Sequence, residues 1–179
     1  MALGFFFNNQ NCYGCKTCTM ACITTQLPGN HETFLRRVNE YRPDVLCGGF
    51  LSLACNHCDD PACLANCPQG AYMKLENGIV KQDHEKCIGC KTCTMSCPYG
   101  VPKYDEASKT VYKCDLCYDR LERGLAPACV EACPGGNLMF GEMDELKAKY
   151  PTAVSDIAGV LPDSSQTHPN LLVLLAEKK

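Results

Sequence analysis

With 17 cysteines in 179 residues, this chain has too many thiols to be interpreted as an ordinary globular domain. Its formal charge of -3 and its scattered lysines and arginines provide no basic surface, which argues against nucleic acid as a partner. No apolar run approaches the roughly 18 to 20 residues that cross a bilayer. The sequence therefore predicts no membrane span of its own.

The N-terminus, MALGFFFNNQNC, has neither a basic segment nor a long apolar one, and we expect no cleavable export signal in it. A secreted disulfide scaffold is the first alternative for a cysteine-rich chain. However, most cysteines are bunched at short separations, and one disulfide framework could hardly use so many local pairs. Metal ligation explains the bunching directly.

The first cysteine group lies in the segment CYGCKTCTMAC, which has the spacing CxxCxxCxxxC. Its members are Cys12, Cys15, Cys18 and Cys22. Two residues between successive cysteines let a tight loop present its sulfurs to one inorganic cube, and Gly14 allows the backbone to approach inorganic sulfide closely. After the third cysteine we expect a helix that directs the fourth toward a second cluster.

Group two has a longer middle interval, and its members are Cys55, Cys58, Cys63 and Cys67. Cys47 precedes it and belongs to no group, so we interpret Cys47 as a buried free thiol. His57 lies inside group two, but a Rieske centre needs two histidines in place of two cysteines. We therefore expect His57 to form a hydrogen bond near the cluster or simply to pack, and His31, His84 and His168 to lie at the surface.

A hairpin is predicted on each side of group three. The first joins 71–75 to 79–81 through the pair Asn77-Gly78, which favours a type I′ turn. The second joins 102–105 to 110–113 through a polar turn at 106–109. Group three, CIGCKTCTMSC, closely repeats the segment of group one, which indicates an internal duplication; its members are Cys87, Cys90, Cys93 and Cys97.

Group four has a long interval between its two halves, and its members are Cys114, Cys117, Cys129 and Cys133. A short helix at 118–123 closed by Gly124 and another at 144–150 stopped by Pro151 are predicted around it. We expect 151–179, with its apolar stretch 171–175, to be a C-terminal tail that wraps the domain or a partner subunit.

All four groups begin with CxxC and end with CxxxC, and a proline follows the last cysteine in groups two, three and four. This pattern matches the bacterial ferredoxin run, in which three cysteines hold one [4Fe-4S] cube and the fourth ligates another. Zinc also binds CxxC pairs, but a zinc ribbon has no use for the third cysteine and the CxxxCP step. No pattern for nucleophilic catalysis, phosphate binding or dinucleotide binding is present, so we expect no catalysis by this chain alone.

The segments GFFFNNQNCYGCKTCTMAC, LACNHCDDPAC, CIGCKTCTMSCPYGVPKY and KCDLCYDR resemble those of the iron-sulfur (electron-transfer, beta) subunit of the dimethyl sulfoxide reductase family of molybdopterin oxidoreductases. This resemblance implies an α+β, loop-rich fold of two interleaved bacterial-type double-cluster ferredoxin modules with short hairpins and helices. It places groups one and four in a module formed by 1–50 with 106–150, groups two and three in an inserted module at 51–105, and 151–179 in the tail.

The resemblance also implies four [4Fe-4S] clusters, because Cys90 stands where nitrate reductase relatives have a tryptophan and carry a [3Fe-4S] cluster. It further implies crossed ligation, in which each group supplies the fourth ligand of another group's cluster. The expected sets, in order, are Cys12, Cys15, Cys18 and Cys133; Cys22, Cys114, Cys117 and Cys129; Cys67, Cys87, Cys90 and Cys93; and Cys55, Cys58, Cys63 and Cys97. In such subunits the first of these clusters faces a large molybdopterin catalytic subunit carrying molybdenum or tungsten, and the last faces a quinol-side membrane anchor, where one exists.

We therefore expect a non-catalytic subunit that relays electrons between a molybdopterin partner and an anchor or another redox partner. The alternative is a free-standing soluble polyferredoxin, which would need no long wrapping tail. Two compartments stay open: the cytoplasm, or the periplasmic face of the cytoplasmic membrane by co-export with a partner that carries a twin-arginine signal.

Overall fold

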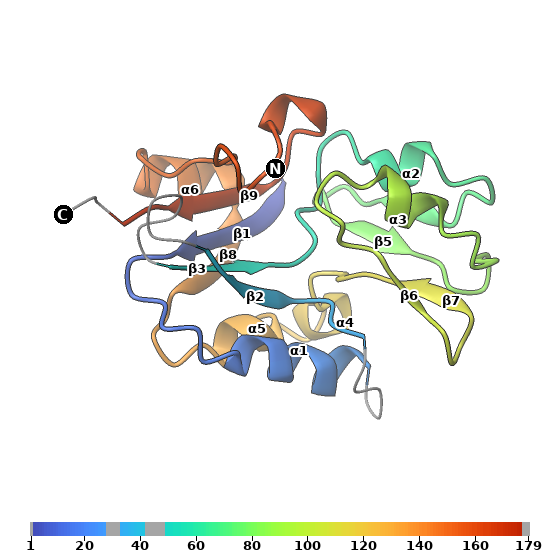
Figure 1. Cartoon of the computed structure of the whole chain (residues 1–179), viewed down its shortest axis with the longest axis horizontal. Coiled ribbons are helices and arrows are strands. Elements are labelled where there is room, and N and C mark those ends of the chain that lie inside the picture. Colours follow the sequence, from blue (N-terminus) through green and yellow to red (C-terminus); the bar gives the residue numbers. More distant parts are fainter. Residues whose placement is uncertain (1, 28–32, 42–48, 177–179) are drawn as a thin grey trace.

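Short helices and strands joined by long loops make up the computed structural model, which describes residues 2–27, 33–41 and 49–176. They form two lobes that lie side by side in Figure 1. One lobe holds both ends of the chain, and the other holds the middle of the sequence. The expected α+β, loop-rich class is confirmed. The interpretation of Cys47 and His31 falls outside the described residues.

A three-stranded sheet forms the centre of the first lobe. It consists of β1 (Leu3–Asn8), β8 (Leu138–Glu142) and β9 (Leu171–Leu174), in the order β8-β1-β9. Strand β1 pairs antiparallel with β8 and parallel with β9. The apolar stretch of the expected tail is therefore an edge strand of this sheet, and Val154 extends the sheet by an antiparallel bridge to Val173.

The FFF run near the N-terminus becomes the buried middle strand, because both of its faces are covered. Phe5 and Phe7 point into the main hydrophobic core, whereas Phe6 points to the opposite face, where it packs with Met143. The ring of Tyr150 stacks on Phe6 with centroids 3.9 Å apart. The three phenylalanines therefore alternate between the two faces of the sheet, as successive side chains of a strand do.

Below this sheet in Figure 1 lie a two-stranded ribbon and two helices. The ribbon consists of β2 (Arg37–Glu40) and β3 (Phe50–Leu53), paired antiparallel. The helices are α1 (Thr17–Gln26) and α5 (Ala128–Glu131). The helix expected after the third cysteine of group one is present, although it begins one residue before Cys18 and also contains Cys22.

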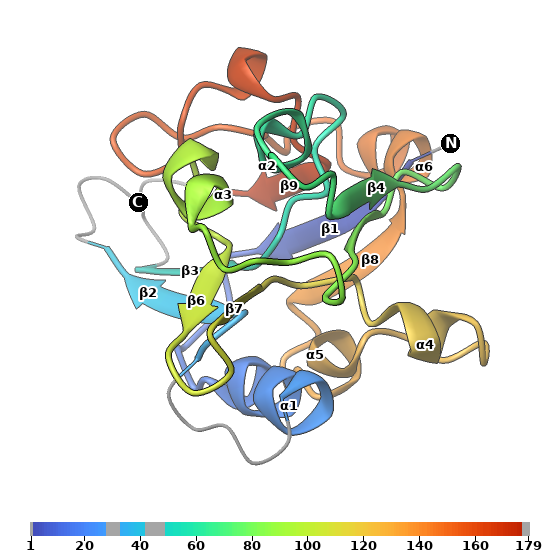
Figure 2. The ribbon, with the colours of Figure 1, turned by 90° about the vertical axis from the view of Figure 1, so that its right-hand side faces the viewer.

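The second lobe consists of two short helices and two hairpins, which Figure 2 shows nearest the viewer. The helices are α2 (Ala62–Ala65) and α3 (Thr92–Ser96). The hairpins are β4 (Tyr72–Lys74) with β5 (Val80–Gln82), and β6 (Lys103–Asp105) with β7 (Thr110–Tyr112). Both predicted hairpins are confirmed.

The type I′ turn predicted at Asn77-Gly78 is wrong. Gly78 has φ 82°, but Asn77 is not among the residues with positive φ, which a type I′ turn requires at both central positions. The amide of Gly78 instead donates to the carbonyl oxygen of Leu75 at 2.9 Å, so Glu76 and Asn77 are the central residues. The turn therefore lies one residue earlier than the sequence favoured, with glycine in the left-handed position that follows it.

The described residues also include α4 (Tyr118–Leu121), α6 (Met143–Lys149) and the 3₁₀ helix η1 (Ser164–Gln166). The helix predicted at 118–123 is α4, which ends at Leu121; Gly124, with φ 72°, lies in the turn that follows, and the amide of Leu125 donates to the carbonyl oxygen of Arg120. That is the bonding of a glycine-terminated helix end. The helix predicted at 144–150 is confirmed as α6, which ends before Pro151.

The expected module boundaries fall inside secondary structure. The boundary at 50/51 lies within β3, whose partner β2 belongs to the first lobe. The boundary at 105/106 lies in the turn of the β6–β7 hairpin, which belongs to the second lobe in Figure 1. If each strand pair is kept whole, the chain passes from one lobe to the other after β3 and after β7, which is a few residues later than each expected boundary.

Candidate iron-sulfur centres

Sixteen cysteines of the four groups are free thiols in the structure. Each group starts as a tight loop, and the left-handed residues of these loops include Lys16, Lys91 and Cys117, with φ of 59°, 63° and 54°. Each of these residues directly precedes the first turn of a helix, α1, α3 or α4. The loops therefore turn back sharply before their helices begin, which curls the cysteines of one group around a common point.

The group-one hollow is lined by four cysteines from both ends of the first lobe. Three belong to group one and the fourth is the last cysteine of group four: Cys12, Cys15, Cys18 and Cys133. Apolar side chains of β1 and β8, Phe7 and Leu138, close the hollow on its inner side. Folding thus brings together the thiols of the first expected set.

The group-two hollow lies in the second lobe and has the same three-plus-one composition. Its cysteines are Cys55, Cys58, Cys63 and Cys97. Burial raises the pKa of Cys58 and of Cys63 to about 12. Lys113, itself buried, also lines this hollow, and its Nζ donates to the carbonyl oxygens of Val80 and Cys114.

The group-three hollow is lined by Cys67, Cys87, Cys90 and Cys93. Cys90 is exposed, as is Cys15 at the equivalent position of group one. In both groups a threonine two residues later lies near the exposed sulfur, with Thr17 Oγ1 and Thr92 Oγ1 each 3.3 Å away. These hydroxyl groups lower the pKa of Cys15 and of Cys90, which favours the thiolate that a metal requires.

The second expected set is brought together around α1 and α5, which contain Cys22 and Cys129. Burial raises the pKa of Cys22 to about 12, and the charges of Arg36, Cys129 and Cys117 also act on it. Burial raises the pKa of Cys114 well above its ordinary value, and Cys22 is the largest charge acting on it. The members of this set, Cys22, Cys114, Cys117 and Cys129, therefore share one buried region.

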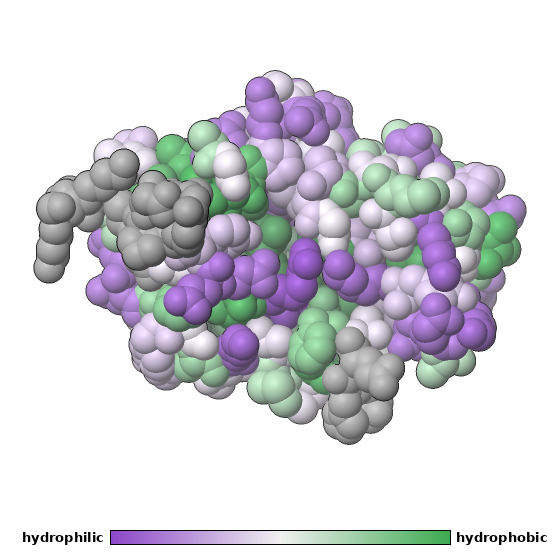
Figure 3. All heavy atoms as spheres, in the orientation of Figure 1, coloured by the Kyte–Doolittle hydropathy of each residue, from purple (hydrophilic) through white to green (hydrophobic). Residues whose placement is uncertain are grey.

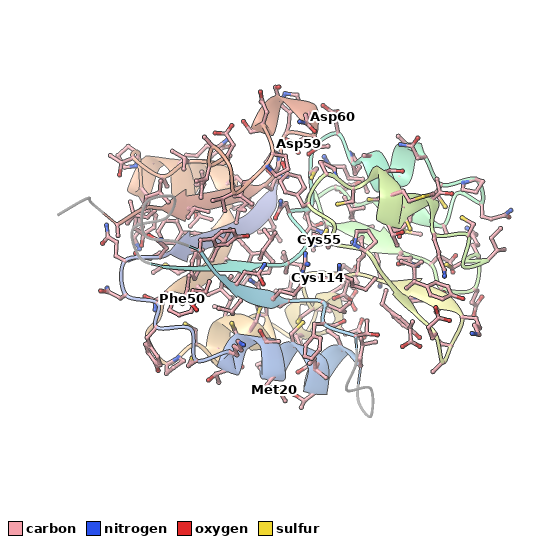
Figure 4. The ribbon with its side chains drawn as sticks, viewed as in Figure 1. Met20, Phe50, Cys55, Asp59, Asp60 and Cys114 are labelled. Carbon is pink, nitrogen blue, oxygen red and sulfur yellow. The ribbon has the colours of Figure 1, made fainter. Side chains whose placement is uncertain are left out.

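Group two and group four meet at the centre of the molecule. Figure 4 shows Cys55 and Cys114 between the two lobes, and the charge of Cys55 contributes to the raised pKa of Cys114 after burial and Cys22. The expectation that the Cys55 set is the last of the four clusters, on the anchor side, is therefore wrong. That set lies at the junction of the lobes because the chain crosses there from β3 into group two, whereas the Cys90 set lies farther out.

His57 occupies this junction and is completely buried. The amide of Val80 donates to its Nδ1 at 3.1 Å, so the ring carries its hydrogen on Nε2, which lies 3.9 Å from Cys114 Sγ. Burial lowers the pKa of His57 well below its ordinary value, so the ring is neutral. The expectation of a hydrogen bond near the cysteines is confirmed, and His84 and His168 are exposed as expected.

Gly14 and Gly89 are required for a reason that the sequence did not reveal. Their φ values are 72° and 68°, in the left-handed region. A Cβ on Gly14 would collide with the ring of Phe50, and one on Gly89 would collide with the carbonyl oxygen of Lys109. Packing against the protein therefore already excludes a side chain, and the approach to inorganic sulfide stays a prediction.

Comparison with known proteins gives the nature of these centres. Residues 47–143 match the family model of the 4Fe-4S dicluster domain. The sequence is 42% identical to one of the chains of anaerobic dimethyl sulfoxide reductase from Escherichia coli, over 95% of this protein and 87% of that one. It is 41% identical to the corresponding chain of the enzyme from Haemophilus influenzae, with the same coverage. It is also 35% identical to one of the subunits of tetrathionate reductase from Salmonella typhimurium, over 92% of this protein and 69% of that one.

This protein belongs to the iron-sulfur subunits of the dimethyl sulfoxide reductase family. Four thiols around one hollow are the donor set that a [4Fe-4S] cluster takes, so the cysteines present fit the cofactor that this family carries. Like the cluster number, the ligand sets remain predictions. Within 2–27, 33–41 and 49–176, no helix is both long and apolar enough to cross a membrane.

Two residues of this iron-sulfur subunit that sequence reasoning missed lie among its cysteines. Arg36 is 1% exposed, and its charge lowers the pKa of Cys22 against the effect of burial. Ser52 is buried, and its Oγ lies 3.5 Å from Cys18 Sγ. Neither belongs to a motif. The threonines Thr17 and Thr92 could have been found, because the duplicated KTCT segment repeats them beside both exposed cysteines.

Proposed function

We propose that this chain is a non-catalytic electron-transfer subunit with four [4Fe-4S] clusters, which relays electrons between a molybdopterin catalytic subunit and a quinol-side membrane anchor or another redox partner. Bound [4Fe-4S] clusters supply one-electron redox chemistry at potentials that the protein sets. The observation that carries the proposal is the three-plus-one composition of the cysteine sets. Relatives in the same family are named as parts of dimethyl sulfoxide and tetrathionate reductases.

The proposed ligands are the sixteen cysteines in their crossed sets. Cys133 completes the set of group one, Cys22 that of group four, Cys67 that of group three and Cys97 that of group two. This exchange of the fourth ligand stays within each lobe. It supports two interleaved ferredoxin modules, divided where the strand pairs separate the lobes.

The four proposed cluster sites form a row whose two ends are exposed and whose middle is buried. Cys15 and Cys90 are exposed, whereas Cys55 and Cys114 are buried at the junction. The proposed order along the row is therefore group one, group four, group two and group three. His57 and the buried Lys113 exclude water from the middle of the row, which keeps the two lobes' centres in a dry environment.

Both ends of the row carry apolar side chains suited to docking. Tyr13 and Met20 are exposed beside group one, and Ile88 and Met95 are exposed at the equivalent positions of group three. Figure 3 shows apolar surface at the outer end of the second lobe. We assign the group-one end to the catalytic subunit, as the family resemblance implies, and the group-three end to the anchor or other redox partner.

A free polyferredoxin is the second candidate. The expected tail had favoured a subunit over a shuttle, but β9 is an integral strand of the sheet, so that argument no longer separates the two. Exposed apolar side chains at both ends favour the subunit, since a freely diffusing carrier gains nothing from them.

The test is anaerobic purification of the tagged chain from its native host. We expect roughly sixteen irons per chain, four for each cube, and co-purification of a large protein that contains molybdopterin. A stable, monodisperse and fully loaded chain without a large partner would establish the polyferredoxin. A colourless zinc protein would overturn both candidates.

A further inference from the structure

Among the residues that the structure describes, Arg36 is a buried cation without a carboxylate partner. It precedes β2 and is 1% exposed, and its Cζ lies 4.5 Å from the ring centroid of Phe5. Nη1 donates to Ser52, 3.1 Å from its Oγ and 3.5 Å from its carbonyl oxygen. Within the described parts of the chain, Nε and Nη2 have no hydrogen-bond acceptor. A buried charge in this condition is strongly destabilising unless another charge compensates it.

The charges of four cysteines act on this guanidinium. Burial lowers the pKa of Arg36, but the charges of cysteines raise it above its ordinary value, in the order Cys129, Cys114, Cys22 and Cys18. The first three belong to the set of group four, and Cys18 belongs to the set of group one. Arg36 therefore lies beside both cysteine sets of the first lobe.

Ser52 connects Arg36 to group one. Arginine only donates hydrogen bonds, so the Oγ of Ser52 accepts from Nη1 and its own hydrogen is free to point elsewhere. Cys18 Sγ lies 3.5 Å from that oxygen. The chain thus provides a relay from a fixed positive charge to a proposed ligand of the group-one cluster.

We propose that Arg36 is the shared counter-charge of the group-one and group-four clusters and that it raises the reduction potentials of both. This inference rests on the proposed function. An oxidised cube with four thiolates carries about -2, and reduction adds one more negative charge. A fixed cation nearby stabilises the reduced state more than the oxidised one. Nε and Nη2, which have no acceptor among the described residues, are free to donate to a bound cluster, and Ser52 transmits the effect on the group-one side.

The test is a redox titration of the intact, anaerobically purified protein, with its partners, followed by electron paramagnetic resonance. Signals are assigned with Cys15→Ser for group one and Cys117→Ser for group four. We expect Arg36→Met, which keeps the bulk and removes the charge, to disfavour reduction of both clusters at least tenfold, a shift of about 59 mV for one electron. Arg36→Lys restores most of this shift.

The neighbouring Arg37 is the matched control. Its Nη2 donates to the carbonyl oxygens of Tyr99 and Gly100, both at 3.3 Å, next to the last ligand proposed for group two. Arg37→Met removes the same charge but is expected to leave the group-one and group-four potentials unchanged. Ser52→Ala makes the smallest change, and we expect it to shift the group-one potential alone.

Unchanged potentials in Arg36→Met with full iron content would overturn the inference, as would equal shifts in Arg36→Lys, which indicate a packing role. If Arg36→Met loses iron, Ser52→Ala decides, and an unshifted group-one signal in that variant would contradict the relay. A wild-type protein without four cluster signals would instead refute the proposed function itself.

Discussion

The two lobes bury different kinds of interior. The first encloses a sheet whose central strand contributes Phe5, Phe6 and Phe7, with leucines of β9 packed beside them. The second has a small cluster of buried side chains: Cys63, Tyr72, Val80, Cys93 and Val111. Two of these are proposed ligands. The first lobe therefore holds most of the main apolar core, to which the second lobe adds Ile79, Tyr99 and Val101. The small cluster within the second lobe is organised around its cysteines.

This difference shows where the inorganic groups must contribute to folding. A small unit with few apolar side chains gains little stability from burial alone and needs a staple such as a metal site. The duplicated groups one and three have nearly the same sequence, but the segments around them differ in structure. One repeat is set into a sheet built from both chain ends, and the other into two short hairpins.

Removal of the iron is expected to have the largest effect and to act unequally on the lobes. Anaerobic chelation should leave the amides of β4 to β7 exchanging at rates close to those of an unfolded chain, because their interior is made of ligands. Amides of β1 and β8 should keep measurable protection. Hydrogen exchange with mass spectrometry checks this, and equal protection in both lobes would contradict the comparison.

Exchange of one crossed ligand should affect one cluster in one lobe. In Cys133→Ser, we expect loss or conversion of the group-one signal in electron paramagnetic resonance, with the group-four signal retained. Cys67→Ser is the matched variant in the second lobe and should affect group three alone. Loss of the group-four signal in the first variant, or of the group-two signal in the second, would refute crossed ligation.

Truncation of a central phenylalanine tests the apolar core of the first lobe. Phe6 is completely buried and stacks on Tyr150. Phe6→Ala should lower the free energy of unfolding by about 3 to 5 kcal/mol. Phe34, at 39% exposure, is the control, and Phe34→Ala should change it by no more than about 0.5 kcal/mol. Guanidinium unfolding of the loaded protein measures both, and similar losses would show that the sheet is not the stabilising element.

The smallest effect is expected at the junction of the lobes. His57→Leu removes the donor to Cys114 Sγ and should lower the potential of the group-four cluster by the equivalent of about 1 kcal/mol, the usual net value of one hydrogen bond. His57→Gln, which can both accept from Val80 and donate, should recover part of it. His84→Gln, at an exposed histidine, should have no effect. An identical group-four potential in all three variants would show that His57 does not influence this cluster.

Local patterns in the sequence were sufficient for the parts that depend on local spacing. The cysteine groups, both hairpins and the helices ending near Gly124 and Pro151 follow from residues close together in the chain. The turn type at Asn77-Gly78 failed because an adjacent pair of residues does not show which carbonyl the Gly78 amide will reach. That choice belongs to the register of the hairpin, which tertiary packing sets.

Other features depend on contacts between residues far apart in the chain. The pairing of β1 with β9 joins Phe5 to Leu171 in parallel, and no local pattern encodes such a partner. Arg36 shows the same limit for the site, since neither arginine of FLRRVNE belongs to a motif with a recognisable spacing. It becomes notable only when folding buries it where the charges of four cysteines act on it.

The parallel neighbours β1 and β9 impose an order on biosynthesis. The second lobe comes from one continuous stretch, so its helices and hairpins can form while the ribosome is still translating the C-terminal part. The first lobe begins with the opening strand but needs Cys133 and then the segment 171–174 to finish its sheet. Cofactor loading of the middle of the chain can therefore precede that of its ends, and a nascent polypeptide halted before residue 171 would present an open edge of β1 to cellular chaperones.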